Sequence, residues 1–424
     1  MTIPSNLLDG KKVLIGVTGS IAAYKTLDLV RLFIKAGAEV KVVMSDAAKK
    51  FVTPLSFEAL SRHQVLEEQS ESWSSDHNHI QAVAWADLFV IAPCSANTLA
   101  KLANAIADNL LLQCALADPK TKLIAPSANT HMLENPLSKA NLKMLAIANY
   151  EVVPTQVKEL ACQTTGDGAM AEPLDIFYHA ARLLLKESYW QDRRVIVTGG
   201  GTIEKIDDVR YISNFSSGKM ASALATALYC KGADVNLIAT RFENNLPHAV
   251  HKIHVDDSEE MLEYLNDSIR IAKKGLLSKA SLMNEEQIHL IQKEPYLFMA
   301  AAVSDYVVSF PQQGKMKKAH LGERFSLELK QNRDLLSSID KEGIITVAFK
   351  AEMDAEHAYD NAKALLERKN VDAVCLNVLR DANSFGSSEN ALTLITREGD
   401  TVLDKQDKFT LSLKLLEVLR GQQG

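Results

Sequence analysis

Cys162 is the residue of this sequence whose surroundings most favour chemistry over packing. It lies in the segment ACQTTGDGAM, residues 161–170, and is followed by Gly166 and Gly168. A free cysteine is usually buried among apolar side chains, but glycines and polar residues are typical of a surface loop that can move. A thiol with a pKa of about 8.5 can donate a proton near neutral pH. The pattern therefore predicts a mobile flap that carries a proton donor.

Three turns of small and polar residues follow three apolar runs in the first half of the chain, at residues 18–21, 92–99 and 125–132. If the runs are neighbouring parallel strands, the turns meet at the carboxyl edge of one sheet, where open α/β sheets bind ligands. Gly19 and Ser20 open a helix whose free N–H groups could hold a phosphate, although such a turn can also be packing geometry alone. Three converging turns favour a planar cofactor, and the lack of GxGxxG spacing disfavours a dehydrogenase-type dinucleotide site.

Two histidines, His77 and His79, lie in the segment DHNHI, just before an expected helix that contains Trp85. From the residues alone, either could be a solvated loop histidine, and the HxH spacing could also serve a metal ion. A catalytic base is the third interpretation of His79.

A second dense group of polar residues occupies 198–220, where TGGGT is followed by Asp207, by VRYISN and by SSGKM. A P-loop NTPase is disfavoured, because Ser213 stands where the first P-loop glycine is needed and Met220 stands where Ser or Thr would bind magnesium. Further on, Asp305 follows an apolar run and Lys315 lies in a lysine-rich turn. Such a turn could bind a phosphate or simply be solvated.

The elements that must hold these residues are two α/β domains in tandem. Residues 12–44 read as strand, Gly/Ser turn, helix and strand, and the pattern returns from residue 193. The sequence predicts two Rossmann-like domains with mostly parallel sheets, divided near Tyr189 after a helix over 174–190. Residues 267–294 are expected to form an exposed helical excursion. Further buried strands are expected at 88–92, 122–125, 296–302, 344–349 and 372–376.

The composition excludes several classes of protein. The chain has 424 residues, 47% of them hydrophobic, and a formal net charge of -6 without a basic block. The length allows two or three domains with apolar cores, and the charge pattern disfavours nucleic acid and membrane surfaces as partners. The five cysteines form no CxxC pair, which argues against a zinc cage or a disulfide framework. Since no apolar stretch is typical of a signal peptide or of a membrane span of ~20 residues, we expect a cytoplasmic protein with reduced thiols.

The first half resembles the flavoprotein family of cysteine decarboxylases. The shared motifs are GSIAAYK, the pair His79-Ile80 with the later WAD, APCSANT, and PSANTHM, which keeps the asparagine and methionine of the family's PAMNxxM signature. The resemblance implies a flavodoxin-like, FMN-dependent phosphopantothenoylcysteine decarboxylase over residues 1–189. It implies that Cys162 donates a proton, that His79 is a base or thiolate orienter, and that Asn129 holds the substrate carboxylate. A basic residue of the family is replaced by Ala84. The implied FMN-binding residues are Gly19, Ser20, Ile21, Ser45, Ser95, Ala96, Asn97, Thr98 and Met132.

The second half resembles the phosphopantothenate-cysteine ligase domain, because TxGGTxExID, VRYISNxSSGKM, AAVSDY and KxKK occur in that order. The resemblance implies a ligase over residues 190–424, which uses CTP and Mg²⁺ to convert 4'-phosphopantothenate into an acyl-cytidylate before L-cysteine attacks. It implies catalytic roles for Asn214, near the acyl group, and Lys315, at the nucleotide, and makes Asp305 a candidate metal ligand. A family lysine is Leu365 here, for which Lys363 could substitute. The implied nucleotide-contacting residues are Met299, Ala300, Ala301, Asp305, Lys315, Arg333, Asp334, Leu335, Leu336, Phe349 and Lys369.

Together the two resemblances predict a bifunctional enzyme of coenzyme A biosynthesis, in which ligation precedes decarboxylation to 4'-phosphopantetheine. The family also implies a homo-oligomer, with trimers of the flavin domain and dimers of the ligase domain that a dodecamer would combine. Two other classes stay open at this point. One is a non-catalytic flavin-binding regulator, and the other is an NAD(P)-dependent oxidoreductase that uses the glycines at 199–201. The cofactor bound to the purified protein would separate these alternatives.

Overall fold

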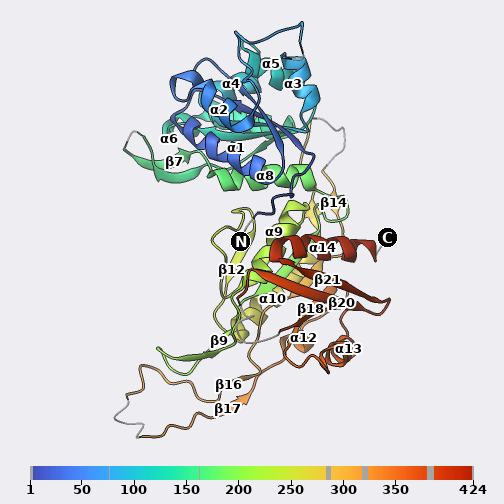
Figure 1. Cartoon of the computed structure of the whole chain (residues 1–424). Coiled ribbons are helices and arrows are strands. Elements are labelled where there is room, and N and C mark those ends of the chain that lie inside the picture. Colours follow the sequence, from blue (N-terminus) through green and yellow to red (C-terminus); the bar gives the residue numbers. More distant parts are fainter. Residues whose placement is uncertain are drawn as a thin grey trace. The chain divides into compact units, whose positions relative to one another are not determined.

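The computed structural model describes residues 3–75, 77–161, 163–282, 288–317, 323–379 and 386–422 (Figure 1). The chain divides into two compact units. The first comprises Ile3–Lys186 with Leu277–His289, and the second comprises Glu187–Leu276 with Leu290–Gly424. Among the described residues, no helix is both long and apolar enough to cross a membrane.

The first unit is built on a five-stranded parallel sheet with the strand order β2-β1-β3-β4-β5. This order is that of a flavodoxin-like doubly wound fold, which places a ligand crevice where the order reverses between β1 and β3. The three central strands are almost entirely buried, as expected when helices cover both faces of a sheet. The strands are β1 Lys12–Val17, β2 Glu39–Met44, β3 Leu88–Ser95, β4 Lys122–Ser127 and β5 Tyr150–Val152.

Helices cover both faces of this sheet, and a short antiparallel hairpin follows β5. On one face α1 and α8 pack together, with the rings of Phe33 and Phe177 5.3 Å apart. The hairpin consists of β6 Gln156–Glu159 and β7 Thr165–Ala169. The helices are η1 Ile21–Tyr24, α1 Lys25–Lys35, η2 Ala48–Lys50, α2 Pro54–Ser61, α3 His79–Trp85, α4 Ala96–Ala103, α5 Leu110–Ala117, α6 Thr130–Glu134, α7 Pro136–Ile147 and α8 Pro173–Leu185.

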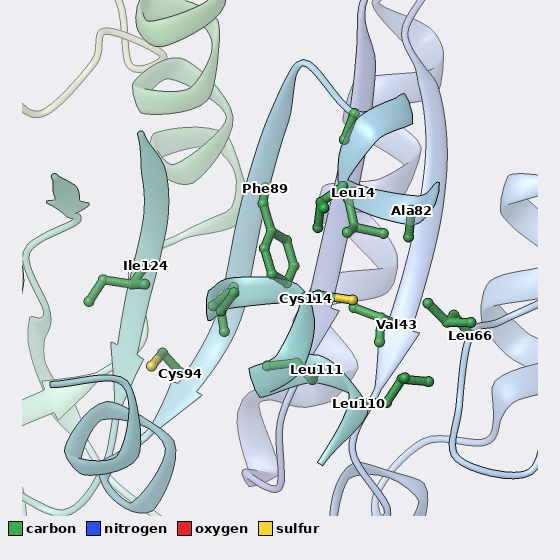
Figure 2. Packing of buried hydrophobic residues seen from close by; sticks show 14 of the residues in the cluster. Leu14, Val43, Leu66, Ala82, Phe89, Cys94, Leu110, Leu111, Cys114 and Ile124 are labelled. Atoms are coloured by element: carbon green, nitrogen blue, oxygen red, sulfur yellow. The ribbon is translucent and has the colours of Figure 1, made fainter. Parts of the chain in front are cut away.

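The other face of the sheet carries a core of tightly packed apolar side chains, shown in Figure 2. Leu14 and Phe89 of the sheet belong to the same cluster as Leu111 and Cys114 of α5, and all four are buried. This core fixes the strands whose carboxyl ends carry the polar turns.

The second unit has an eight-stranded sheet with the order β12-β11-β8-β15-β18-β19-β20-β21. Neighbouring strands are parallel from β12 to β19, and the last two strands add antiparallel pairs. The strands are β8 Arg194–Gly199, β11 Asp234–Ala239, β12 His251–His254, β15 Tyr296–Met299, β18 Ile345–Glu352, β19 Ala373–Val378, β20 Glu389–Thr396 and β21 Asp400–Asp407.

Helix α9 is buried along nearly its whole length, because it packs between the sheet and α14. Helix α10 contributes Met261 and Leu265 to a separate apolar cluster with Ile196 and Leu297 of the sheet. The helices are α9 Lys219–Cys230, α10 Ser258–Ala272, α12 Leu335–Ser338, α13 Ala358–Arg368 and α14 Lys408–Gly421. Short paired strands are β9 Ile203–Lys205 with β10 Tyr211–Ser213, β13 Leu276–Leu277 with β14 Leu290–Ile291, and β16 Tyr306–Val308 with β17 Leu329–Gln331.

The predicted fold class is confirmed, since both main sheets are parallel or mostly parallel and alternate with helices. Three local predictions were wrong. The strand expected over 296–302 ends at Met299, and the helix expected over 174–190 ends at Leu185. The segment 267–294 is helical only as far as Ala272, after which its described residues include β13 and β14.

Candidate active sites

Direct hydrogen bonds join the three polar turns of the first unit. The hydroxyl of Thr18, after β1, donates to the carbonyl oxygen of Pro93 over 2.7 Å and accepts the N–H of Ser95 over 2.9 Å. Ser20 accepts the N–H of Ala22, which caps η1, and its Oγ lies 3.0 Å from Oγ of Ser127 at the end of β4. The expected convergence of turns at one sheet edge is therefore present.

These turns and the β6–β7 hairpin line a cavity of about 780 Å³, which we call the strand-edge cavity. A side chain at Gly19 would place its Cβ 2.5 Å from Cβ of Ala47, so only glycine fits this tight turn. Of the residues predicted from sequence, the cavity is lined by Gly19, Ser20, Ile21, Ser95, Ala96, Asn97, Asn129 and Met132.

Two residues predicted to bind the cofactor do not line this cavity. Ser45 donates its backbone N–H to the carbonyl oxygen of Val17 over 3.1 Å, and its hydroxyl lies near the same oxygen. Thr98 is 7% exposed, and its Oγ1 accepts the hydroxyl of Ser95 over 3.1 Å. Their contacts support the lining turns rather than the cavity surface.

The β6–β7 hairpin is tied to the cavity wall by charge and by close packing. Glu172 accepts hydrogen bonds from Lys25 over 3.0 Å and from Lys158 of β6. Burial pushes the pKa of Glu172 upward, but hydrogen bonds from these two lysines outweigh it and hold the pKa below its ordinary value. A Cβ at Gly168 would lie 2.2 Å from the carbonyl oxygen of Ala128, so β7 needs glycine to approach the turn after β4.

Cys162, the predicted proton donor, lies outside the described residues. Its neighbours Leu160 and Ala161 line the strand-edge cavity, as do Lys25 and Lys158, which sequence reasoning missed. The signal for Lys25 was available in GSIAAYK, whereas Lys158 stands in no motif that we recognised.

His79 is the first residue of α3 and does not line the strand-edge cavity. Its Nδ1 lies 2.9 Å from Oε1 of Glu71. His77 has a different partner, because its Nε2 lies 3.0 Å from Oγ of Ser70. The two histidines therefore occupy distinct environments.

In the second unit, the glycine-rich turn and two loops meet at the carboxyl edge of the sheet. The side-chain amide of Asn214 donates to the carbonyl oxygen of Val303 over 3.0 Å, and it lies 3.4 Å from that of Ala302. Gly201 pairs with Ala302 in a parallel bridge, and a Cβ at Gly201 would lie 2.5 Å from the carbonyl oxygen of Asn214. The motif TGGGT therefore lies beside the loop after β15, and glycine at position 201 leaves room for the loop that carries Asn214.

Two cavities lie at this edge, and both are lined by Ala301, Asp305 and Phe349. The larger, about 640 Å³, is also lined by Asn214 and Ala300, and we call it the Asn214 cavity. The smaller, about 470 Å³, is called the Arg333 cavity. Its lining adds Met299, Arg333, Asp334, Leu335 and Leu336.

The two remaining predicted residues have different positions. Lys369 forms an ion pair with Asp334, and its Nζ lies 3.0 Å from Oγ of Ser337. Lys315 lines a separate cavity of about 650 Å³, formed with residues of the segment between β16 and β17. The neighbouring Met316 donates its N–H to Asp207, whose pKa is held well below its ordinary range by hydrogen bonds from Arg210 and backbone N–H groups.

Two lysines that sequence reasoning missed line the Asn214 cavity. Nζ of Lys219 donates to the carbonyl oxygen of Gly386 over 2.7 Å, and Nζ of Lys408 donates to that of Ser387 over 2.5 Å. Burial, together with the nearby charge of Lys219, lowers the pKa of Lys408 to about 8. Lys219 belongs to the SSGKM motif, but Lys408 begins the last helix and no local pattern marked it.

Among the described residues, no group of three or more His, Cys, Asp or Glu side chains could hold a metal ion by itself.

Each of the two α/β units carries cavities at the carboxyl edge of its own sheet, and two family models match the chain with the same division. Residues 1–184 match the model of the Flavoprotein family. Residues 190–274 and 276–421 match the model of the DNA/pantothenate metabolism flavoprotein C-terminal domain.

The whole chain is similar to curated bifunctional proteins. It is 36% identical to the coenzyme A biosynthesis bifunctional protein CoaBC of Haemophilus influenzae over 98% of this chain and 99% of that protein. It is 34% identical to the corresponding protein of Bacillus subtilis over 97% of each. A solved PPC decarboxylase mutant in complex with pantothenoylaminoethenethiol is 34% identical, over 40% of this chain and 96% of that chain, with a TM-score of 0.38. The chain belongs to the CoaBC family and is a bifunctional enzyme of coenzyme A biosynthesis.

Proposed function

We propose that this enzyme joins L-cysteine to 4'-phosphopantothenate at the expense of CTP and then decarboxylates phosphopantothenoylcysteine to 4'-phosphopantetheine with FMN. The observation that supports this most is that each α/β unit has its own cavities at the carboxyl edge of its own sheet. We assign the decarboxylase to residues 1–189 and the ligase to residues 190–424. Membership of a bifunctional enzyme family argues against the regulator and dehydrogenase alternatives.

The strand-edge cavity fits FMN in size and in chemistry. Its volume of about 780 Å³ lies in the range of small-molecule sites. The turn at Gly19 and Ser20 lies in the cavity wall, where it would carry the phosphate, and the small residues Ser95 and Ala96 leave room for a flat ring. Met132 would pack against that ring.

Bound flavin supplies reversible two-electron chemistry, which gives the substrate a carbanion sink during loss of carbon dioxide. The protein must position the substrate and move its protons. Asn129, whose Oδ1 accepts the N–H of His131 and so caps α6, would hold the substrate carboxylate. His79 would take the thiol proton, and Cys162 would protonate carbon at the end of the reaction.

An oligomer would complete this site. His79 lies away from the strand-edge cavity of its own chain, so a neighbouring copy in a trimer of first domains is the proposed source of the base. The same reasoning applies to Lys315, which lines a different cavity from Asn214 and Asp305 and would act across a dimer of second domains.

In the second domain, we propose that CTP occupies the Arg333 cavity and that the pantothenoyl carboxylate lies beside Asn214. The shared wall at Asp305 and Phe349 would bring the α-phosphate and the carboxylate together. Mg²⁺ would bind Asp305 and the nucleotide phosphates. The cations Lys219 and Lys408 would attract the anionic acid.

The test is to purify the protein, identify its bound cofactor, and then supply phosphopantothenate, cysteine and CTP. The proposal expects a yellow protein that releases FMN on denaturation and forms pyrophosphate, CMP and carbon dioxide. Stoichiometric NAD(P) in place of flavin, or ligation without any nucleotide, would refute it.

A further inference from the structure

The loop before α3 places a carboxylate on one nitrogen of the His79 ring. Oε1 of Glu71 lies 2.9 Å from Nδ1 of His79. The two side chains are 24% and 20% exposed, so water competes for this contact far less than at an open surface. A carboxylate accepts hydrogen bonds, and therefore the shared proton belongs to Nδ1.

The remainder of the loop restrains the same ring. Trp73 meets His79 edge to face, with ring centroids 5.5 Å apart and an interplanar angle of 87°. The N–H of Ser72 donates to the carbonyl oxygen of His77 over 2.8 Å, which closes the turn that carries Trp73. Asn78 accepts the N–H of Gln81 and so caps α3 immediately before His79. The ring is thus held by a carboxylate, by an aromatic neighbour and by a capped helix.

A proton fixed on Nδ1 leaves the lone pair of Nε2 as the acceptor. In catalytic triads a buried carboxylate acts in the same way on a histidine. It holds the imidazole in one tautomer and stabilises the charged ring that forms. When the substrate S–H bond breaks, its proton would bond to Nε2 and its electron pair would stay on sulfur. The negative charge of Glu71 would then face the imidazolium.

We infer that Glu71 is a positioning residue for decarboxylation, which orients His79 and keeps its Nε2 free to accept the proton of the substrate thiol. This inference rests on the proposed role of His79.

The experiment compares Glu71→Gln with Glu67→Gln in the full-length, flavin-loaded protein. Glu67 is a matched control, because it lies in the same segment, is 22% exposed and pairs with Lys49 instead of a histidine. Glu71→Gln is expected to lower kcat for decarboxylation of supplied phosphopantothenoylcysteine at least about 10-fold with KM little changed. That loss is smaller than the ~10²- to 10⁴-fold that removal of a general base costs. Glu71→Asp should recover part of the rate, and Glu67→Gln should behave as the wild type.

A second readout does not depend on turnover. Diethyl pyrocarbonate modifies the unprotonated nitrogen of imidazole, and mass spectrometry of the peptide that contains His79 gives its rate. The rate is compared at about pH 8.5, where neutral imidazole predominates. Since a hydrogen bond to an anion increases electron density on the far nitrogen, Glu71→Gln should slow the modification of His79. A loop that had merely loosened would expose the ring and speed it, which would overturn the inference.

His79→Asn separates the role of Glu71 from the role of His79. If His79→Asn is inactive in decarboxylation while Glu71→Gln keeps wild-type kcat and modification rate, the role of Glu71 is refuted and the proposed function stands. If His79→Asn decarboxylates normally, the proposed role of His79 is refuted, and the role of Glu71, which depends on it, is refuted as well.

Discussion

The side-chain amide of Asn214 donates a hydrogen bond to the carbonyl oxygen of Val303 over 3.0 Å, and so joins the loop after β10 to the loop after β15. Both loops line the Asn214 cavity, where Asp305 also lies. One amide therefore fixes the separation between the motif VRYISN and the motif AAVSDY. Because the reacting groups of an acyl transfer must be held in an aligned geometry, we expect this link to contribute to the proposed ligation.

Asn214→Ala is expected to lower the rate of cysteine ligation about 10²-fold, because loss of the bond to Val303 would let the two loops shift, and a misplacement of about 1 Å costs roughly that factor. The rate of ligation is measured by the release of pyrophosphate and by the formation of phosphopantothenoylcysteine. Asn236→Ala is the matched control, because the amide of Asn236 contacts His251 on the neighbouring edge strand β12. Ligation at the wild-type rate by Asn214→Ala would remove this residue from the site.

Glu172 gives a prediction about acid stability. Its pKa in the folded protein lies below the ordinary 4.5, because hydrogen bonds from Lys158 and Lys25 outweigh the effect of burial. A carboxyl whose folded pKa is depressed stabilises the folded state above its unfolded pKa, and that stability is lost as pH falls through the folded value. The free energy of unfolding of the first domain should therefore fall below about pH 4.5, less steeply in Glu172→Gln than in the wild type.

Urea denaturation at a series of pH values measures this difference. Glu159→Gln, which removes an exposed carboxylate of the same hairpin, is the control and should leave the slope unchanged. Equal slopes for Glu172→Gln and the wild type would mean that the contacts with the lysines contribute nothing to the fold.

The cysteines give a prediction about reactivity. Cys94, Cys114, Cys230 and Cys375 are all 0% exposed, and burial raises the pKa of both Cys94 and Cys114 to about 12. Since the thiolate is the reactive form, these four should resist iodoacetamide at neutral pH in the folded protein. Cys162, in the predicted flap, should be the thiol that reacts.

Mass spectrometry of the alkylated peptides identifies the labelled residue. Cys162→Ser should abolish the labelling and block the final protonation, while flavin reduction and release of carbon dioxide continue, because serine is a far weaker acid. Unchanged formation of 4'-phosphopantetheine by Cys162→Ser would exclude the residue from the mechanism.

Trp190 tests whether the second domain begins where the sequence indicates. Its ring is fully buried, with centroids 5.0 Å from Tyr189 and 4.9 Å from Tyr296. Trp190→Ala should lower the free energy of unfolding of the second domain by about 3–5 kcal/mol through loss of buried area and creation of a cavity. Trp190→Phe should cost less, because the buried indole N–H has no hydrogen-bond partner among the described residues.

Calorimetry of the full chain measures the unfolding transitions of both domains. If Trp190→Ala shifted the unfolding of the first domain instead, residues 187–190 would belong to the core of that domain.

Much of the fold could be predicted from the sequence, because buried parallel strands are near-continuous apolar runs and the turns after them are rich in glycine and serine. The contacts of Thr18 and Ser20 follow from that pattern once the strands are neighbours. The ends of elements were less predictable. Residues 300–302 remain apolar but leave the strand, and the carbonyl oxygens of Ala302 and Val303 face the side-chain amide of Asn214 instead.

Residues brought together from distant parts of the chain could not be predicted in this way. Lys408 begins the last helix and reaches the cavity of Asn214 only because β20 and β21 return the chain to the sheet edge. Glu71 lies in a polar segment where many carboxylates could be solvated, and only its distance to His79 distinguishes it. The order of the motifs likewise did not indicate that Lys315 lines a different cavity from Asn214.

Each kind of domain is assigned one of the two reactions, and the most direct test of that assignment follows carbon dioxide and pyrophosphate separately in His79→Asn and Lys315→Ala. His79→Asn should release pyrophosphate and accumulate phosphopantothenoylcysteine, while Lys315→Ala should still release carbon dioxide when that intermediate is supplied. Mixing the two variants should restore 4'-phosphopantetheine formation from phosphopantothenate, cysteine and CTP. If folded, flavin-bound His79→Asn lost both products, the assignment of one reaction to each domain would be wrong.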